Sequence, residues 1–162
     1  MIYITGDTHN SVDMSNLSTQ NMKLCCMEQG TDFHSITHAI VLGDFGLPWY
    51  TASVDKSGIH PNDATDKYLF KWYKQKPFKI LAVMGNHDNY DMIEKLPEVE
   101  MFGSTVLKVS YNVFYLKRGK IYTIEDKRFL VLGGALSDDK DWRKPHESWW
   151  EQEEWSEVDT EN

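Results

Sequence analysis

The sequence predicts one domain of mixed α/β and α+β class, in which strand–helix–strand units are followed by antiparallel hairpins. Three apolar runs in the first half each end in glycine and polar residues, and helical stretches lie between them. Beyond about residue 105, short alternating runs are separated by turn residues, which is typical of hairpins. Because 162 residues can bury a hydrophobic core, we expect a single domain over residues 1–162.

The first half is predicted to alternate strands with helices. Runs of β-branched and aliphatic residues predict strands at residues 1–5, 38–42 and 78–83. Helical patterns occupy residues 13–29, 63–76 and 90–96. Ser11 or Asp13 could cap the first helix, and Gly30 could end it. The other two helices end at prolines, Pro77 and Pro97, which cannot continue a helix.

The second half is predicted to be mainly β-structure. Four short strand-like runs lie at residues 105–109, 112–116, 120–124 and 128–132. Turn residues at 118–119 and 125–127 join the last three runs as antiparallel hairpins. Residues 146–158 are rich in Trp and Glu and are expected to begin another helix with a solvated acidic face. Residues 47–62 have no clear period, so we expect a long loop of the kind that often carries function.

Composition argues against a membrane-spanning, secreted or disulfide-rich protein. The chain has no run of about 20 apolar residues, so no membrane span is predicted. The first apolar run reaches Asp7 too soon for a signal peptide. Cys25 and Cys26 are adjacent and do not suggest a disulfide framework, which favours a reducing, cytoplasmic location. The formal charge of −8 is concentrated after residue 137, which argues against duplex nucleic acid as a partner of that segment.

Polar side chains follow each of the three strands predicted in the first half. Asp7 and His9 follow the first strand, and residues two apart on an extended stretch point the same way. Asp44 follows the second strand, and Asn86 and His87 follow the third. Ligands bind at the carboxyl ends of strands in open α/β sheets, so these side chains are expected to converge there. The alternative for each stretch alone is an ordinary polar turn.

The converging side chains predict a site for two divalent cations. Asp7, His9 and Asp44 offer ligands to one cation, and Asp44 could bridge to a second that Asn86 also binds. His87 would lie beside the metals, where it could protonate a leaving oxygen or bind phosphate. Imidazole and amide ligands beside carboxylates suit Mn²⁺, Fe or Zn²⁺ better than Mg²⁺.

Three stretches of the chain resemble the first three motifs of the calcineurin-like metallophosphoesterases: Gly6-Asp7-Thr8-His9, Gly43-Asp44 and Gly85-Asn86-His87-Asp88. The resemblance covers nearly the whole chain, and the 133–140 stretch with the Trp149–Trp150 pair is similar to a bacterial and phage-type branch. It implies a four-layer β-sandwich of mixed sheets flanked by helices. It also implies the metal ligands named above, His87 as the leaving-group acid, and Asp88 as its neighbour in the catalytic loop.

The sequence departs from the family pattern in two places. The family supplies another ligand His after a fourth strand and a Gly-His-x-His motif near its end, but the only His after His87 is His146. We therefore expect a chain truncated before these motifs, whether a fragment, a partial gene product or a natural short form, with a weak second metal site. Many members also carry Asp-Arg-Gly where this chain has Asp44-Phe45-Gly46, so the partner that orients His87 is not evident.

These features predict a metallophosphoesterase that hydrolyses a phosphate mono- or diester with a metal-bound hydroxide. The expected substrates are small phosphate esters, nucleotides or phosphoproteins, and the 47–62 segment is the candidate for selecting among them. The alternative is a catalytically weak or inert fragment that acts, if at all, as a binding module. The tryptophans near the end are expected to cover the core, with base or sugar stacking as the alternative: Trp142, Trp149, Trp150 and Trp155.

Overall fold

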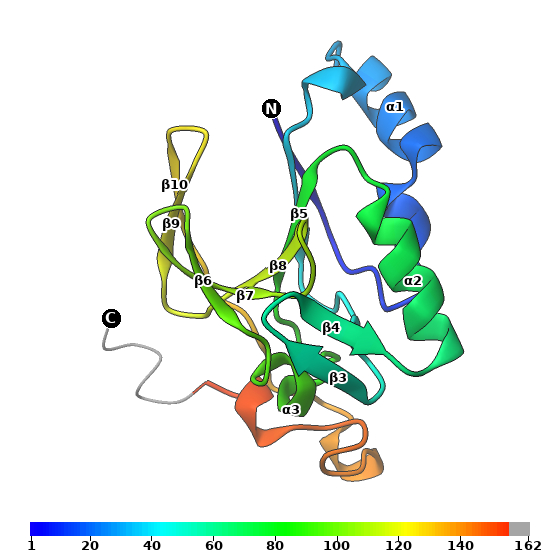
Figure 1. The fold of residues 1–162 in the computed structure, drawn as a ribbon, viewed down its shortest axis with the longest axis vertical. Helices are drawn as coiled ribbons and strands as arrows, with labels where there is room; N and C mark the ends of the chain where they lie inside the picture. The colour runs from blue at the N-terminus through cyan, green and yellow to red at the C-terminus, as the bar shows by residue number, and fades with distance from the viewer. Residues whose placement is uncertain (156–162) are drawn as a thin grey trace.

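The computed structural model describes residues 1–155 and places a six-stranded mixed sheet at the centre of the molecule (Figure 1). The strand order is β1-β2-β5-β8-β7-β6. Four neighbouring strands are parallel: β1 (Ile2–Thr5), β2 (His38–Leu42), β5 (Lys79–Val83) and β8 (Val113–Leu116). Two antiparallel strands complete the sheet, β7 (Ser104–Lys108) and β6 (Glu98–Met101). The predicted mixed class is therefore confirmed.

The register of the parallel strands brings together the loops that follow β1, β2 and β5. Thr5 of β1 pairs with Val41 of β2, and Val41 pairs with Ala82 of β5. The chain therefore leaves all three strands at the same edge of the sheet. Asp7 and Asp44 lie only two and three residues beyond the paired positions.

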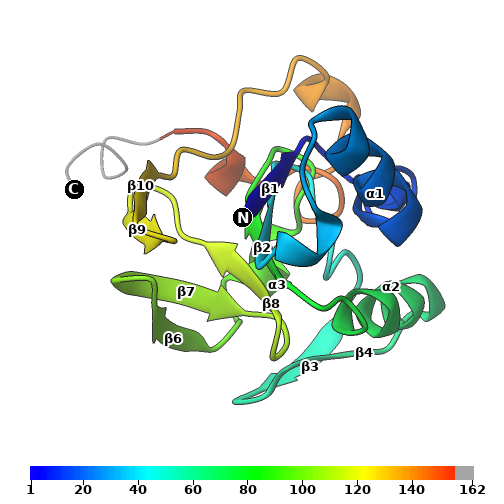
Figure 2. The ribbon, with the colours of Figure 1, turned by 90° about the horizontal axis from the view of Figure 1, so that it is seen from above.

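Each face of the sheet carries its own hydrophobic core. On one face, α1 (Thr19–Glu28) and α2 (Ala64–Lys74) pack against alternate strand residues such as Val41 and Ala82. On the other face, the hairpin of β9 (Ile121–Ile124) and β10 (Lys127–Leu130) packs against the intervening residues, among them Ile40 and Leu81 (Figure 2). Among residues 1–155, this two-stranded hairpin is what represents the second sheet expected of a sandwich.

The predicted helix over residues 13–29 is divided in two. A 3₁₀ turn, η1 (Met14–Leu17), precedes α1, and Ser18 between them is extended, with φ −71° and ψ 144°. The Ser18 side chain accepts a hydrogen bond from the backbone N–H of Asn21, so Ser18 caps α1, and neither Ser11 nor Asp13 does. The α2 helix begins as predicted, because Asp63 accepts from the N–H groups of its first turn.

The predicted loop at residues 47–62 is wrong in part, because it contains a β-hairpin. Strands β3 (Ala52–Asp55) and β4 (Gly58–Pro61) pair antiparallel. Gly58 has φ +122°, and a Cβ there would lie 2.1 Å from the carbonyl oxygen of Val109. The next residue, Ile59, donates its N–H to the same oxygen at 3.0 Å. The hairpin is therefore held by a distant part of the chain, which no local pattern indicates.

The predicted pairing of 112–116 with 120–124 is also wrong. Both edges of β8 are occupied, by β5 on one side and β7 on the other, so β9 pairs only with β10 among the described strands. Strand β6 was not predicted. The remaining short elements are η2 (Phe33–Ser35), α3 (Tyr90–Ile93), η3 (Lys140–Trp142) and η4 (Glu151–Glu153).

Residues 133–155 run across the carboxyl ends of the parallel strands instead of forming a helix (Figure 1). Of the predicted helix at 146–158, the described part holds only η4, and residues 156–158 lie outside the described residues. Glu153 is fully buried, so the expectation of a solvated acidic face is wrong there. Trp150 is buried as expected, but Trp142 is 90% exposed and covers no core. Between residues 1 and 155, no helix has the length and apolar character of a membrane span.

The packing of α2 generates a first prediction. Leu69 is fully buried in the core beneath this helix, whereas Tyr68 is 57% exposed. We expect Leu69→Ala to lower the free energy of unfolding by about 2–5 kcal/mol, because it removes buried methyl groups and leaves a cavity. Tyr68→Ala should change it by less than about 1 kcal/mol. Urea unfolding of both variants tests this, and equal losses would contradict the packing described.

Candidate metal centre

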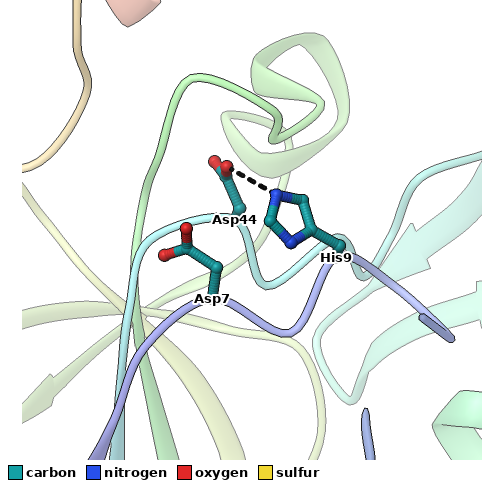
Figure 3. A group of neighbouring side chains, drawn as sticks. All are labelled: Asp7, His9 and Asp44. Atoms are coloured by element: carbon teal, nitrogen blue, oxygen red, sulfur yellow. Dashed lines mark ion pairs between the residues drawn. The ribbon is translucent and has the colours of Figure 1, made fainter. Parts of the chain in front are cut away.

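Asp7, His9 and Asp44 converge at the carboxyl ends of β1 and β2 (Figure 3). One ligand atom from each side chain lies within 4.8 Å of the others. His9 Nε2 lies 3.2 Å from Asp44 Oδ2. Asp44 is buried, while Asp7 and His9 are exposed, so the group has one buried wall and opens to solvent.

Left-handed backbone conformations turn these side chains toward one another. His9, Asn10 and Asp44 have φ values of +43°, +58° and +46°, which non-glycine residues adopt at some cost. The N–H of His9 donates to the carbonyl oxygen of Asp44 at 2.7 Å. The Asn10 side chain donates to the carbonyl oxygen of Gly46, also at 2.7 Å. The two loops therefore hold each other in these conformations.

A third loop packs directly against Asp44 because residue 85 is glycine. A Cβ at Gly85 would lie 2.0 Å from Asp44 Oδ1 and 2.4 Å from its backbone nitrogen. Asp44 Oδ1 instead accepts a hydrogen bond from the N–H of His87 at 2.8 Å. One carboxylate oxygen of Asp44 thus faces the third loop and the other faces His9.

Asn86 and His87 extend the site along the third loop. The amide nitrogen of Asn86 donates to Ser137 Oγ at 3.0 Å, which makes its carbonyl oxygen the atom it can offer a cation. The His87 ring lies edge-on to the His9 ring, with 5.9 Å between centroids. The four sequence-predicted ligands therefore come from three neighbouring loops, with His87 beside them.

Asp88 lies beneath the site rather than in it. Its buried carboxylate accepts from the N–H groups of Gly46 and Gly85, at 2.7 and 2.9 Å, and from the Tyr115 hydroxyl at 3.1 Å. Burial and, to a smaller extent, the charge of Asp44 raise the pKa of Asp88 to about 6, against the opposing effect of the hydrogen bonds. Asp88 joins the second and third loops, so its contribution to a reaction would be through their positions.

Three polar residues of the 133–155 segment reach the site and were not predicted: Ser137, Arg143 and Glu153. Arg143 Nη2 lies 3.0 Å from His87 Nδ1 and 3.1 Å from the Asn86 carbonyl oxygen. The only signal for Arg143 in the sequence was one arginine within an acidic segment. His146, the only His after His87, pairs with Asp91 at 2.9 Å and lies outside the Asp7–His9–Asp44 group.

Two cavities flank the metal-ligand group. One of about 410 Å³ has Asp7, Asp44 and Asn86 at its polar end and is otherwise lined mainly by apolar strand residues. The other, of about 230 Å³, lies between His9 and His87 and is also lined by Trp49 and Tyr50. The second cavity is thus lined by both histidines and by the start of the 47–62 segment. A ligand bound there would contact the histidines and that segment.

Comparison with known protein families matches residues 1–161 to calcineurin-like phosphoesterases. The chain belongs to the calcineurin-like phosphoesterase family. Members of such a family are hydrolases acting on phosphate esters with divalent metal ions, as the motifs and the Asp7–His9–Asp44 group predicted. No curated protein and no solved structure matches the chain significantly. The bacterial and phage-type branch and the truncation remain predictions.

The residues of this phosphoesterase fit a divalent cation at the first position. Two carboxylates and an imidazole converge there, and the Asp44 carboxylate can take its place only because Gly85 lacks a Cβ. Such a mixed oxygen and nitrogen donor set suits Mn²⁺, Fe or Zn²⁺.

The contact at Gly85 generates a second prediction. Gly85→Ala places a methyl group where Asp44 lies, so the carboxylate must move. We expect the affinity for Mn²⁺, measured by isothermal titration calorimetry, to fall at least about tenfold. Gly6→Ala is the matched control, because nothing lies within 4 Å of a Cβ there. An unchanged affinity of Gly85→Ala would show that Asp44 does not bind the metal.

Asp66 generates a third prediction. It is buried and accepts from the N–H groups of Trp49 and Tyr50, at 3.1 and 2.9 Å, and burial raises its pKa above that of an exposed Asp. The folded chain therefore holds a proton on Asp66 more tightly than the unfolded chain, so this residue's contribution to stability falls as the pH rises above about 4. Asp66→Asn does not titrate. We expect the excess stability of the wild type over this variant to be largest near pH 4 and to narrow toward pH 7 in urea unfolding.

Proposed function

We propose that this phosphoesterase hydrolyses a phosphate mono- or diester and requires divalent cations to do so. The observation that carries the proposal is the convergence of Asp7, His9 and Asp44 at the carboxyl ends of adjacent parallel strands. The family match supports the reaction class, and the cavities beside the group give room for a ligand.

We assign the first cation to Asp7, His9 and Asp44, and a second, weaker one to Asp44 and Asn86. Mn²⁺, Fe and Zn²⁺ are the metals that this donor set favours. Bound divalent cations supply a nucleophile at neutral pH and neutralise charge on the phosphoryl group. The protein holds Asp44 ready for both positions, through the hydrogen bond from His87 N–H and the close approach of Gly85.

His87 is our candidate for contact with the reacting phosphate ester. Its imidazole lines the 230 Å³ cavity together with His9, so a phosphate at the metals would lie within reach of both rings. The His87 imidazole would donate a proton to the leaving oxygen or a hydrogen bond to the phosphate. Asp88 would act by holding the loop that carries His87.

For the substrate, we propose a small phosphate ester, a nucleotide or a phosphoprotein. Trp49 and Tyr50 line the cavity beside His87, which supports the 47–62 segment as the part that selects it. Aromatic side chains there could stack a base or an aryl group. Cys25 and Cys26 are free, which supports a cytoplasmic location.

A second candidate function is a binding module with little or no catalysis. The observation that favours it is the poor supply of ligands at the second position, where only Asp44 and Asn86 are assigned. A single cation at the first position could still bind a phosphate group without clamping both reacting oxygens.

Turnover by the purified chain distinguishes the two functions. With added Mn²⁺ we expect hydrolysis of an aryl phosphate or an aryl phosphodiester, with loss of activity in Asp44→Asn. His87→Ala should lower kcat by about 10²–10⁴-fold, because it removes the group proposed to contact the phosphate or the leaving oxygen. His34→Ala is the control, because His34 is exposed on η2 and lies outside the group. No turnover, together with sub-stoichiometric Mn²⁺, would instead support the binding module.

A further inference from the structure

Arg143 makes a set of contacts that the proposed reaction does not yet use. Its side chain is only 6% exposed, and Nη2 lies 3.0 Å from His87 Nδ1 and 3.1 Å from the Asn86 carbonyl oxygen. Arg143 and His87 are 56 residues apart in the sequence. One guanidinium nitrogen thus reaches the ring of His87 and the backbone of Asn86 at once, and Nη1 remains available for other partners.

The hydrogen-bonding chemistry of this contact fixes the state of the imidazole. A guanidinium has five N–H donors and no acceptor, so His87 Nδ1 must accept the hydrogen bond. A ring nitrogen that accepts carries no proton, and the proton of the neutral ring then lies on Nε2. A carboxylate in the same place would select the opposite tautomer, because it can only accept.

We propose that Arg143 is a positioning residue for His87, which fixes its ring and makes Nε2–H its donor. The proposal rests on the proposed function for its catalytic meaning. The N–H of His87 is already bonded to Asp44, so the guanidinium completes the restraint from the side-chain end. His87 would then present one defined donor, Nε2–H, to a phosphate ester. Its ring would lose no further conformational freedom when the ester binds.

The surroundings of Arg143 hold the guanidinium in place. Its Nη1 donates to Ser137 Oγ at 2.7 Å and lies 3.5 Å from Glu153 Oε2. Ser137 in turn donates to Glu153 and accepts from the amide nitrogen of Asn86. One buried cluster of the 133–155 segment therefore orients both Asn86, a proposed metal ligand, and His87.

The test must separate positioning from simple stability. Removing Arg143 alone leaves the buried Glu153 carboxylate without its cation, which can unfold the protein. We therefore choose the double variant Arg143→Met with Glu153→Gln, and Glu153→Gln alone as its partner control. Arg143→Lys keeps the charge but not the planar fork. Arg128→Gln, at an exposed arginine of β10, is the remote control.

The first measurement is the ¹⁵N resonance pattern of the His87 ring in the full chain, metal-free and with Zn²⁺, assigned by its loss in His87→Ala. We expect Nδ1 without a proton and Nε2 with one in the wild type and in Glu153→Gln. In the double variant the Nδ1 resonance should move to the position of a nitrogen without a hydrogen-bond donor. A protonated Nδ1 in the wild type, or an unmoved resonance in the folded double variant, would overturn the proposal.

The second measurement is steady-state hydrolysis with Mn²⁺. We expect the double variant to lose at least about tenfold in kcat with KM changed less than about twofold, and Arg143→Lys to recover part of the loss. Arg128→Gln should match the wild type. A folded double variant with wild-type kcat would overturn the positioning role. If the wild type shows no turnover, the proposed function fails, and the His87 resonances alone decide whether Arg143 holds the ring.

Discussion

The close approach of Gly85 to Asp44 is the constraint on which the whole site depends. With no Cβ in the way, the third loop comes near enough for His87 N–H to bind Asp44 Oδ1. That approach in turn requires β2 and β5 to be adjacent and in register. The geometry of one carboxylate is thus set by the sheet, and any change in strand pairing would move the metal ligands apart.

The close packing of the second and third loops also places the carboxylate of Asp88 near that of Asp44. Asp88 is fully buried, so loss of hydration disfavours its charged form, and the nearby charge of Asp44 adds a smaller repulsion. Two backbone N–H groups and the Tyr115 hydroxyl partly compensate, yet the pKa of Asp88 still stands at about 6. A cation bound by Asp44 would relieve this repulsion, so metal binding and the stability of the loops are expected to be coupled.

Local sequence patterns predicted the parts of the fold that local interactions determine. The apolar runs of β1, β2 and β5 and the polar residues after them identified Asp7, His9 and Asp44, because strand and loop alternate within a few residues. The β3–β4 hairpin and the place of β8 were missed, since Gly58 fits against Val109 and β8 inserts between β5 and β7 through contacts distant in sequence. Arg143 was missed for the same reason, because its contacts with Asn86 and His87 span 57 and 56 residues.

The 133–155 segment changes how the chemistry of the site is understood. Sequence motifs left His87 without an evident orienting partner. The structure places the guanidinium of Arg143 next to His87 Nδ1. Because a guanidinium can only donate hydrogen bonds, the neutral ring is then a donor at Nε2. A neutral Nε2–H is a weak acid but a good hydrogen-bond donor. If Arg143 positions His87 as proposed, a hydrogen bond from Nε2–H to the phosphate or the leaving oxygen is the contact to expect, rather than full proton transfer.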